Sequence, residues 1–170
     1  MVQQPVYDWD LAETGDASPP LVVQATIDFI AEFCRVARYE NPVYTSQAAA
    51  KESGLPGGAA PPAMVLALAP VNLSSLAAAK GCLLPVDPDA TGPAELAISP
   101  SKLSIKFQGA MVSPGDEVTS VTPTQGKSQD QNGRYISFRV IAHNQKGAPE
   151  VDYTQTFSWP EPGSCPPAEP

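Results

Sequence analysis

The chain has 170 residues, which is enough for one compact domain but not for two independent cores. Its 10 basic and 18 acidic residues give a formal net charge of −8, and no stretch gathers lysines and arginines, so a nucleic-acid partner is not expected. The hydrophobic fraction of 42% is that of ordinary globular chains and excludes wholesale disorder. We therefore expect a single domain with a packed core.

The three cysteines, Cys34, Cys82 and Cys165, are odd in number and far apart. They lack the spacing of zinc ligands or of a disulfide framework, so we expect neither a metal nor a cofactor. No run approaches the roughly 18 apolar residues of a membrane span, and the acidic N-terminus has no apolar signal core. These features predict a cytoplasmic protein without membrane contact.

The N-terminal third predicts one strand and two helices. Alternating apolar residues within residues 1–20 favour a short strand followed by a loop. Apolar residues at helical spacing after Thr26, a good N-cap, predict a helix over about 27–38. A second helix, short and rich in alanine, is expected over 46–52.

A third helix is predicted from Pro61 to about Gly81, and it is apolar on nearly all sides. Proline is tolerated in a first helical turn, whereas Pro70 in the interior should remove a hydrogen bond and bend the axis. A helix of this kind needs burial on most sides, and a sheet wrapped around it would supply that burial.

After a linker at 85–93 the apolar residues recur at alternate positions, which predicts four antiparallel strands. The apolar positions are Leu103, Ile105 and Phe107; Val118 and Val121; Ile136, Phe138, Val140 and Ala142; and Val151, Tyr153, Phe157 and Trp159. A polar hairpin loop is expected at 126–133, and residues 161–170 resemble a disordered Pro-rich tail. Helices followed by strands predict an α+β fold, with a curled antiparallel sheet wrapped around a long central helix.

Four segments follow one another in a distinctive order. They are a helix at 27–33, the segment YENPVY at 39–44, the segment GAAPPAM at 58–64, and Phe107 followed by a Pro-Gly-Asp turn within 112–118. This order resembles the MaoC-like dehydratases and (R)-specific enoyl-CoA hydratases, which have the hot-dog fold. The resemblance covers about residues 22–160, so we expect an N-terminal strand and loop (1–20), a hot-dog domain (21–160) and a tail (161–170).

The resemblance also shows where this chain departs from the family. The family's active-site segment, G-D-x-N-P-x-H, supplies an Asp and a His that hold the water added to, or removed from, the substrate. Tyr39 and Tyr44 stand at these two positions, and phenols are poor general bases at neutral pH. The single histidine, His143, falls on a late strand outside this segment. The usual catalytic dyad is therefore expected to be missing.

A further departure concerns the start of the central helix. The family usually has a glycine there, whose N–H polarises the thioester carbonyl of the substrate. Pro62 stands at the matching position and has no N–H, so only the Ala63 N–H or the helix dipole could compensate. The resemblance implies that the substrate is contacted by Asn41, Pro62, Ala63 and Met64.

Three residues of the 39–44 segment are candidate catalytic groups: Tyr44, Glu40 and Tyr39. Tyr44 could act as an acid, orient a substrate, or simply pack at the mouth of the fold. Glu40 could act as a base if it were buried; otherwise it is a solvated residue at a helix end. Asn41 is expected to hold the turn by capping.

Other polar residues have more ordinary interpretations. His143 is expected beside a turn, Asp116 is a turn former, and Cys34 belongs on the apolar face of its helix. Lys102, Lys106 and Arg134 could meet the phosphates of a CoA thioester or lie on solvated strand faces.

Three functions remain open. The resemblance implies a subunit that binds an acyl-CoA or acyl-carrier thioester and works with a second hot-dog chain carrying Asp and His. The first alternative is a self-sufficient homodimer that uses its tyrosines and Glu40 for a different elimination, isomerisation or cyclisation. The second is a small-molecule binding module without chemistry. A curled sheet exposes an edge, so we expect an oligomer in each case.

Overall fold

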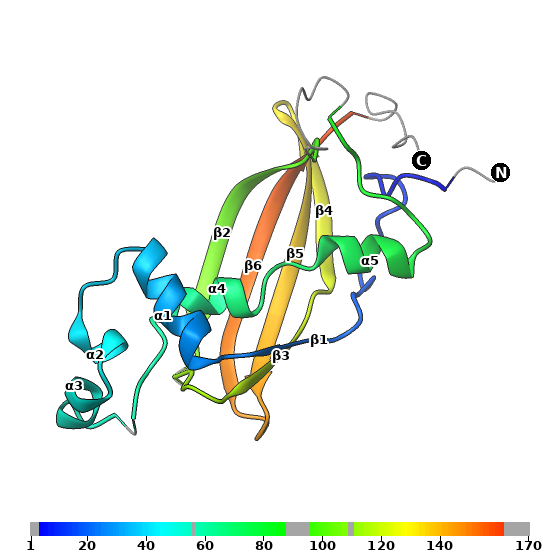
Figure 1. Ribbon diagram of the computed structural model, residues 1–170. Helices are drawn as coiled ribbons and strands as arrows, with labels where there is room; N and C mark the ends of the chain where they lie inside the picture. The colour runs from blue at the N-terminus through cyan, green and yellow to red at the C-terminus, as the bar shows by residue number, and fades with distance from the viewer. Residues whose placement is uncertain (1–3, 56, 88–95, 109–110, 162–170) are drawn as a thin grey trace.

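The computed structural model describes residues 4–55, 57–87, 96–108 and 111–161. They form a six-stranded antiparallel sheet that curls around a central helical segment, with three further helices beyond one end of that segment (Figure 1). The elements are β1 (Leu21–Gln24), α1 (Ile27–Val36), α2 (Pro42–Thr45), α3 (Gln47–Glu52), the 3₁₀ turn η1 (Pro62–Met64), α4 (Val65–Leu68), α5 (Leu73–Ala79), β2 (Ser99–Phe107), β3 (Glu117–Val121), β4 (Thr124–Asp130), β5 (Gly133–Asn144) and β6 (Pro149–Trp159). The predicted α+β fold, a curled sheet around a central helix, is confirmed.

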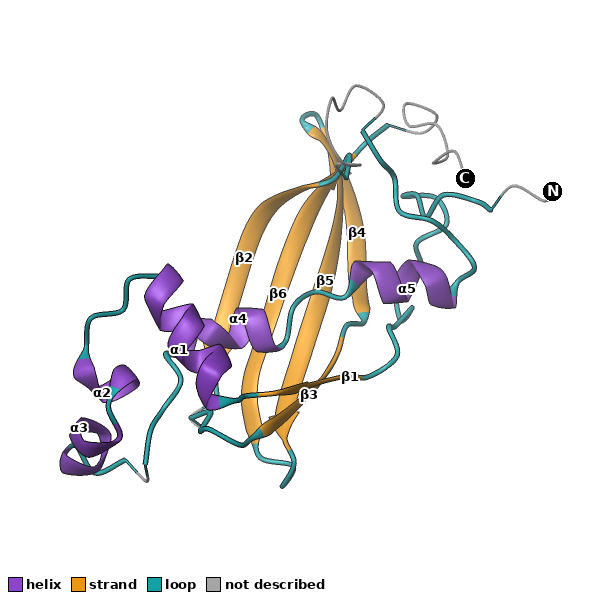
Figure 2. Cartoon of the chain, in the orientation of Figure 1, coloured by secondary structure: helices purple, strands orange, loops and turns teal. Residues whose placement is uncertain are grey.

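The sheet has the order β1-β3-β5-β6-β2, and β4 pairs with the other half of β5. Figure 2 shows α4 and α5 lying across one face of the long strands. The largest buried residues of the sheet, among them Phe138, Val140 and Tyr153, face these helices. Burial on both sides thus explains why this segment is so apolar.

Two strands were not predicted. β1 is short, and its sequence Leu-Val-Val-Gln has three consecutive apolar residues, so it shows no alternation that predicts a strand. β4 occupies most of the stretch that was expected to be a polar loop at 126–133, and that prediction is wrong. Its side chains from Ser128 to Asp130 are exposed, but its backbone pairs with β5 as far as Asp130 and Gly133. Backbone pairing with a long neighbour, rather than side-chain burial, makes this segment a strand.

The first described residues do not form the predicted strand. Residues 4–20 contain turns and isolated bridges, such as the one between Val6 and Leu83. Tyr7 is nevertheless fully buried, with its ring centroid 6.1 Å from that of Trp159. Trp9 packs partly against the same core cluster, whereas Leu11 is 43% exposed, so the alternation of apolar residues here does not mark a strand. Most of the predicted linker at 85–93, and the predicted tail beyond Glu161, lie outside the described residues.

The predicted central helix is interrupted. η1 and α4 form its first part, α5 forms its second, and residues 69–72 between them are not helical. Pro70 has no N–H to continue the hydrogen-bond ladder, so the expected bend is a complete break. The Tyr153 hydroxyl donates a hydrogen bond to the carbonyl of Ala69 at 2.7 Å, and both residues are buried. A side chain from β6 therefore satisfies a carbonyl at the break.

The expectation that no segment is long and apolar enough to span a membrane needs correction. Residues 62–79 reach the required length and apolar composition. The structure divides this segment at residues 69–72, and Met64, Leu68 and Leu76 within it are fully buried in the core of the fold. Its composition is therefore that of a core helix.

The Tyr153 hydrogen bond gives a first prediction. Tyr153→Phe keeps the ring but leaves the Ala69 carbonyl without its donor in a buried environment. We expect a loss of about 1 to 2 kcal/mol in the free energy of unfolding, measured by urea denaturation. Tyr135→Phe on β5, where Tyr135 is only half-buried, is the matched control and should cost less. Equal stabilities of the two variants would contradict this role for the Tyr153 hydroxyl.

Candidate functional site

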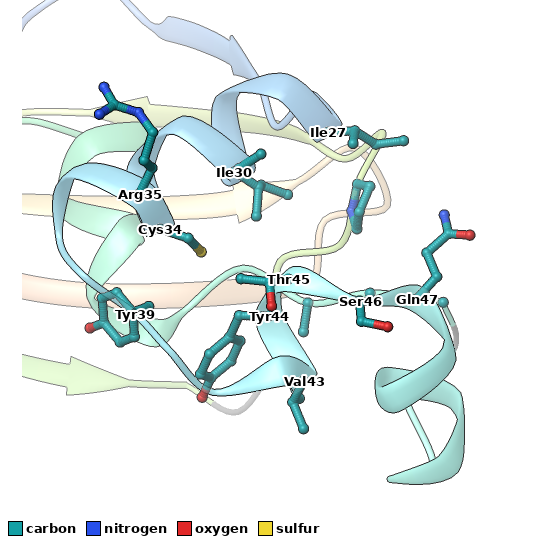
Figure 3. Close-up of a pocket in the computed structure, with 15 residues that line it drawn as sticks. Ile27, Ile30, Cys34, Arg35, Tyr39, Val43, Tyr44, Thr45, Ser46 and Gln47 are labelled. Atoms are coloured by element: carbon teal, nitrogen blue, oxygen red, sulfur yellow. The ribbon is translucent and has the colours of Figure 1, made fainter.

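The helices α1, α2 and α3 enclose a cavity at one end of the fold (Figure 3). Its volume is about 350 Å³. We call it the tyrosine pocket; its lining includes Ile30, Cys34, Tyr39, Val43, Tyr44 and Pro114. Most of these side chains are apolar, so the cavity suits an apolar group.

Local sequence signals build the segment that carries the two tyrosines. Thr26 caps α1 as predicted, its hydroxyl accepting the Phe29 N–H at 3.1 Å. The helix ends at Val36, earlier than predicted, because Arg38 adopts a left-handed conformation (φ 55°) and the Tyr39 N–H bonds the Cys34 carbonyl. Asn41 then caps α2, its side-chain oxygen accepting the Val43 N–H at 3.1 Å. The expectation that Asn41 caps a turn is thus met.

These turns bring Tyr39 and Tyr44 together. Their ring centroids are 5.8 Å apart in an edge-to-face arrangement, and Phe33 stacks on Tyr39 at 6.1 Å. Figure 3 shows both phenol oxygens on the side of the rings away from Ile30 and Cys34. The rings therefore wall the cavity, while the hydroxyls point away from its apolar floor.

The structure separates the other predicted site residues. Glu40 is exposed and is not among the lining residues of either cavity described here. Ala63 is exposed, whereas Met64 is fully buried in the core. Pro62 lines a second cavity, on the sheet side of the helix start. The 39–44 segment and the start of the central helix thus contribute to two different cavities.

The remaining polar candidates also lie apart from the tyrosine pocket. His143 on β5 is paired with Thr119 and lines neither cavity. Asp116 holds its turn, accepting hydrogen bonds from the Ser113 N–H and the Gln145 amide. Burial raises the pKa of the Cys34 thiol, which makes it a poor nucleophile. Lys102 and Lys106 are exposed on β2, and the Arg134 guanidinium lies 5.0 Å from the Trp9 ring centroid.

The second cavity contains an ionisable side chain, Glu150, that the sequence analysis did not single out. We call it the Glu150 pocket; it has a volume of about 240 Å³ and is lined by Ala60, Pro61, Pro62, Val65, Phe107, Met111, Val112 and Glu150. Glu150 is only 2% exposed, and neither carboxyl oxygen has a hydrogen-bond partner among the described residues. All other lining residues are apolar.

An irregularity in the sheet puts Glu150 there. Ala142 on β5 faces Val151, but the next residue, His143, faces Pro149, so Glu150 is an extra residue on β6. Such a β-bulge re-aims side chains that strict alternation would place on the opposite face. Because Val151 follows the alternating pattern, the sequence predicts that Glu150 faces outward. No sequence signal indicates the bulge.

The surroundings of Glu150 change its chemistry. Burial raises the pKa of its carboxyl from an ordinary value of 4.5 to about 7, and the negative charge of Asp116 acts in the same direction. The group therefore changes protonation near neutral pH. A carboxyl of this kind can donate a proton or a hydrogen bond where an ordinary glutamate cannot.

Comparison with known proteins supports the fold. No protein-family profile and no curated protein matches the sequence. Solved structures match it along most of its length, including a monoamine oxidase regulatory protein from Archaeoglobus fulgidus (TM-score 0.71, 16% identity, 95% of this chain and 100% of that chain). A MaoC-like dehydratase from Rhodospirillum rubrum matches with a TM-score of 0.65 and 16% identity, over 91% of this chain and 98% of that chain. The C-terminally truncated HadBC (3R-hydroxyacyl-ACP dehydratase) complex from Mycobacterium tuberculosis matches with a TM-score of 0.65 and 17% identity, over 85% and 95%.

This chain has the hot-dog fold. The expected resemblance to MaoC-like dehydratases is confirmed at the level of structure. At these identities the match speaks to the fold alone. Within this hot-dog fold, the tyrosine pocket lies beneath the segment that resembles the family's active-site motif.

The raised pKa of Glu150 gives a second prediction. Above the pKa of the unfolded chain, burying the ionised carboxyl is unfavourable, so the wild type should lose stability as pH rises from about 4.5 to about 7.5. Glu150→Gln has no charge to bury. We expect the free energy of unfolding of Glu150→Gln, relative to that of the wild type, to rise by about 1 to 3 kcal/mol across this pH range. Urea denaturation at both pH values measures it.

Glu52→Gln is the control, because Glu52 is exposed at the end of α3. Its stability relative to the wild type should stay constant between the two pH values. An advantage of Glu150→Gln that did not change with pH would contradict the buried, titrating state of Glu150.

Proposed function

We propose that this chain is an acyl-thioester-binding hot-dog subunit of a 3-hydroxyacyl-thioester dehydratase or enoyl-CoA hydratase. It works with a second hot-dog chain that supplies the Asp and His. The observation that carries this proposal is the tyrosine pocket, where the segment resembling the active-site motif presents two phenol rings in place of the dyad. A binding role needs only the apolar cavity, which this chain retains.

The dimensions of the tyrosine pocket support an acyl ligand. Its volume of about 350 Å³ is in the range of small-molecule sites. Ile30, Cys34 and the two tyrosine rings offer an apolar surface for an acyl chain, while a charged carrier would remain in solvent. The ligand is therefore an acyl-CoA, an acyl-carrier thioester or a related small molecule.

An exposed sheet edge supports a partner chain. β2 ends the strand order and pairs only with β6 among the described strands. Leu103 and Phe107 on this strand are 46% and 49% exposed, and Met111 beyond it is 45% exposed. Covering such an edge favours association. HadBC, a structural match, is named as a complex; the partner here is a second hot-dog chain, identical or different.

A second candidate function is favoured by one observation. Glu150, with its titrating carboxyl beside Pro62, could serve a self-sufficient homodimer that runs a different elimination, isomerisation or cyclisation. In that case the catalytic group would come from β6 and not from Glu40, which is exposed.

We also propose a cytoplasmic location. Cys34 and Cys82 are both buried and free. Free thiols are typical of a reducing compartment.

Activity with and without a partner tests the proposal. The purified chain should bind crotonyl-CoA in calorimetry. The rate of crotonyl-CoA hydration in its presence should not exceed the uncatalysed rate in buffer. Adding a MaoC-like chain with an intact Asp/His motif should give a complex that hydrates crotonyl-CoA. Rapid hydration by the isolated chain would favour the self-sufficient enzyme instead. If crotonyl-CoA does not bind and no partner restores activity, the proposal is wrong.

The tyrosine pocket gives a matched pair of variants. Tyr44→Ala removes a ring from the cavity wall, so we expect crotonyl-CoA to bind about tenfold more weakly, the equivalent of about 1.4 kcal/mol. Glu40→Gln alters an exposed neighbour and should bind crotonyl-CoA like the wild type. Equal affinities of Tyr44→Ala and the wild type for crotonyl-CoA would show that the ligand does not bind in this pocket.

A further inference from the structure

The Glu150 pocket presents a polar group that no described residue satisfies. The Glu150 side chain is almost fully buried, and both of its carboxyl oxygens lack a hydrogen-bond partner among the described residues. Burying a carboxyl in this way is unfavourable unless it is paired, so an unpaired one in a cavity needs a reason. A ligand that accepts a hydrogen bond from the protonated carboxyl is one such reason.

The pocket is held open by backbone hydrogen bonds rather than by mobile side chains. The Gln108 N–H bonds the Glu150 carbonyl at 3.1 Å, which ties the end of β2 to the bulge. The Ala60 N–H bonds the Val112 carbonyl at 2.8 Å, which ties the start of the helical segment to the opposite wall. Pro61 between these walls is fully buried. The backbone of these two walls is therefore fixed without a ligand, which lowers the entropic cost of binding.

The charges around the pocket restrict the ligand. No lysine, arginine or histidine lines it among the described residues, and the charged group that acts on Glu150 is Asp116, in the turn before β3. An anionic ligand would meet two carboxyl groups and no cation. An anionic ligand is therefore disfavoured. A cation would be attracted by ionised Glu150, but an ammonium group has three N–H donors and would leave N–H donors without acceptors among the lining side chains.

A neutral ligand with an acceptor oxygen fits these constraints. When protonated, the Glu150 carboxyl has an O–H to donate. Pro61 and Pro62 have no N–H, and among the lining side chains the Glu150 carboxyl is the hydrogen-bond donor. Val65, Phe107 and Met111 provide apolar contacts for the rest of the molecule, and about 240 Å³ suits a short chain.

We propose that the Glu150 pocket binds a neutral, short-chain carbonyl compound, such as a thioester or a ketone, and that the protonated Glu150 carboxyl donates a hydrogen bond to its carbonyl oxygen. The site is separate from the tyrosine pocket. It rests on the proposed function only in the choice of a thioester as one probe.

Binding should depend on pH. The neutral carboxyl is the binding form, and its pKa is about 7. The apparent dissociation constant should therefore rise about tenfold between about pH 6 and pH 8, as the protonated fraction falls. Hexanoyl N-acetylcysteamine thioester and methyl pentyl ketone, both uncharged, are the probes. Calorimetry in two buffers of different ionisation enthalpy should show proton uptake on binding near pH 8.

Two variants separate the hydrogen bond from the cavity. Glu150→Gln keeps an N–H donor but has no titration, so its affinity should be independent of pH and show no proton uptake. Glu150→Leu keeps the volume without a donor, and near pH 6 it should bind both probes about three- to tenfold more weakly than the wild type. Removing a buried, unpaired carboxyl does not endanger folding. The control Glu52→Gln should keep the wild-type pH dependence.

The outcomes with methyl pentyl ketone bear on the Glu150 site alone, because the thioester probe could also enter the tyrosine pocket. Equal affinities of the wild type and Glu150→Leu near pH 6, or a wild-type affinity independent of pH, would overturn the Glu150 site. If neither probe binds the wild type, the site is also wrong, even if crotonyl-CoA binds in the tyrosine pocket. If methyl pentyl ketone binds with the expected pH dependence while crotonyl-CoA does not bind, the Glu150 site stands and the proposed function fails.

Discussion

The break in the central helical segment, and the hydrogen bond that Tyr153 makes to it, organise the rest of the structure. Because Pro70 cannot continue the helix, α4 and α5 are separate, and each supports its own part of the core. One cluster gathers α1, α4 and the β5–β6 residues Val140 and Tyr153; the other gathers α5, Phe138 and Trp159. Tyr153 joins the sheet to the point where the two clusters meet.

The two cavities lie on opposite sides of the chain that leads into η1. On one side, α1 to α3 form a cap whose turns are fixed by Thr26, Asn41 and the left-handed Arg38. On the other side, the ends of β2 and β6 approach the two prolines and enclose Glu150. The same short stretch of chain thus separates a cavity walled by aromatic rings from one with a single titrating group.

The group that can exchange a proton near neutral pH therefore lies on a different element from the segment that resembles the family's motif. The segment that resembles an acid–base motif offers phenol rings whose hydroxyls point away from the cavity floor. The group that does titrate near neutrality stands on β6, where a low-dielectric environment and Asp116 raise its pKa. A shared fold is therefore compatible with a different distribution of roles.

Local signals in the sequence determined much of this protein. The Thr26 cap, α3, the alternation of β5 and β6 and the apolar central segment all depend on neighbouring residues or on a repeat, so they were predictable, as was the fold class. Tyr39 and Tyr44 were singled out through the motif as candidate catalytic residues, and the structure places both in the lining of the tyrosine pocket. The tertiary structure alone decided the strand character of β4, the burial of Tyr7, the donor for the Ala69 carbonyl and the inward direction of Glu150. Each of these depends on a partner distant in sequence or on a one-residue change of register, and a register shift leaves no trace in composition or periodicity.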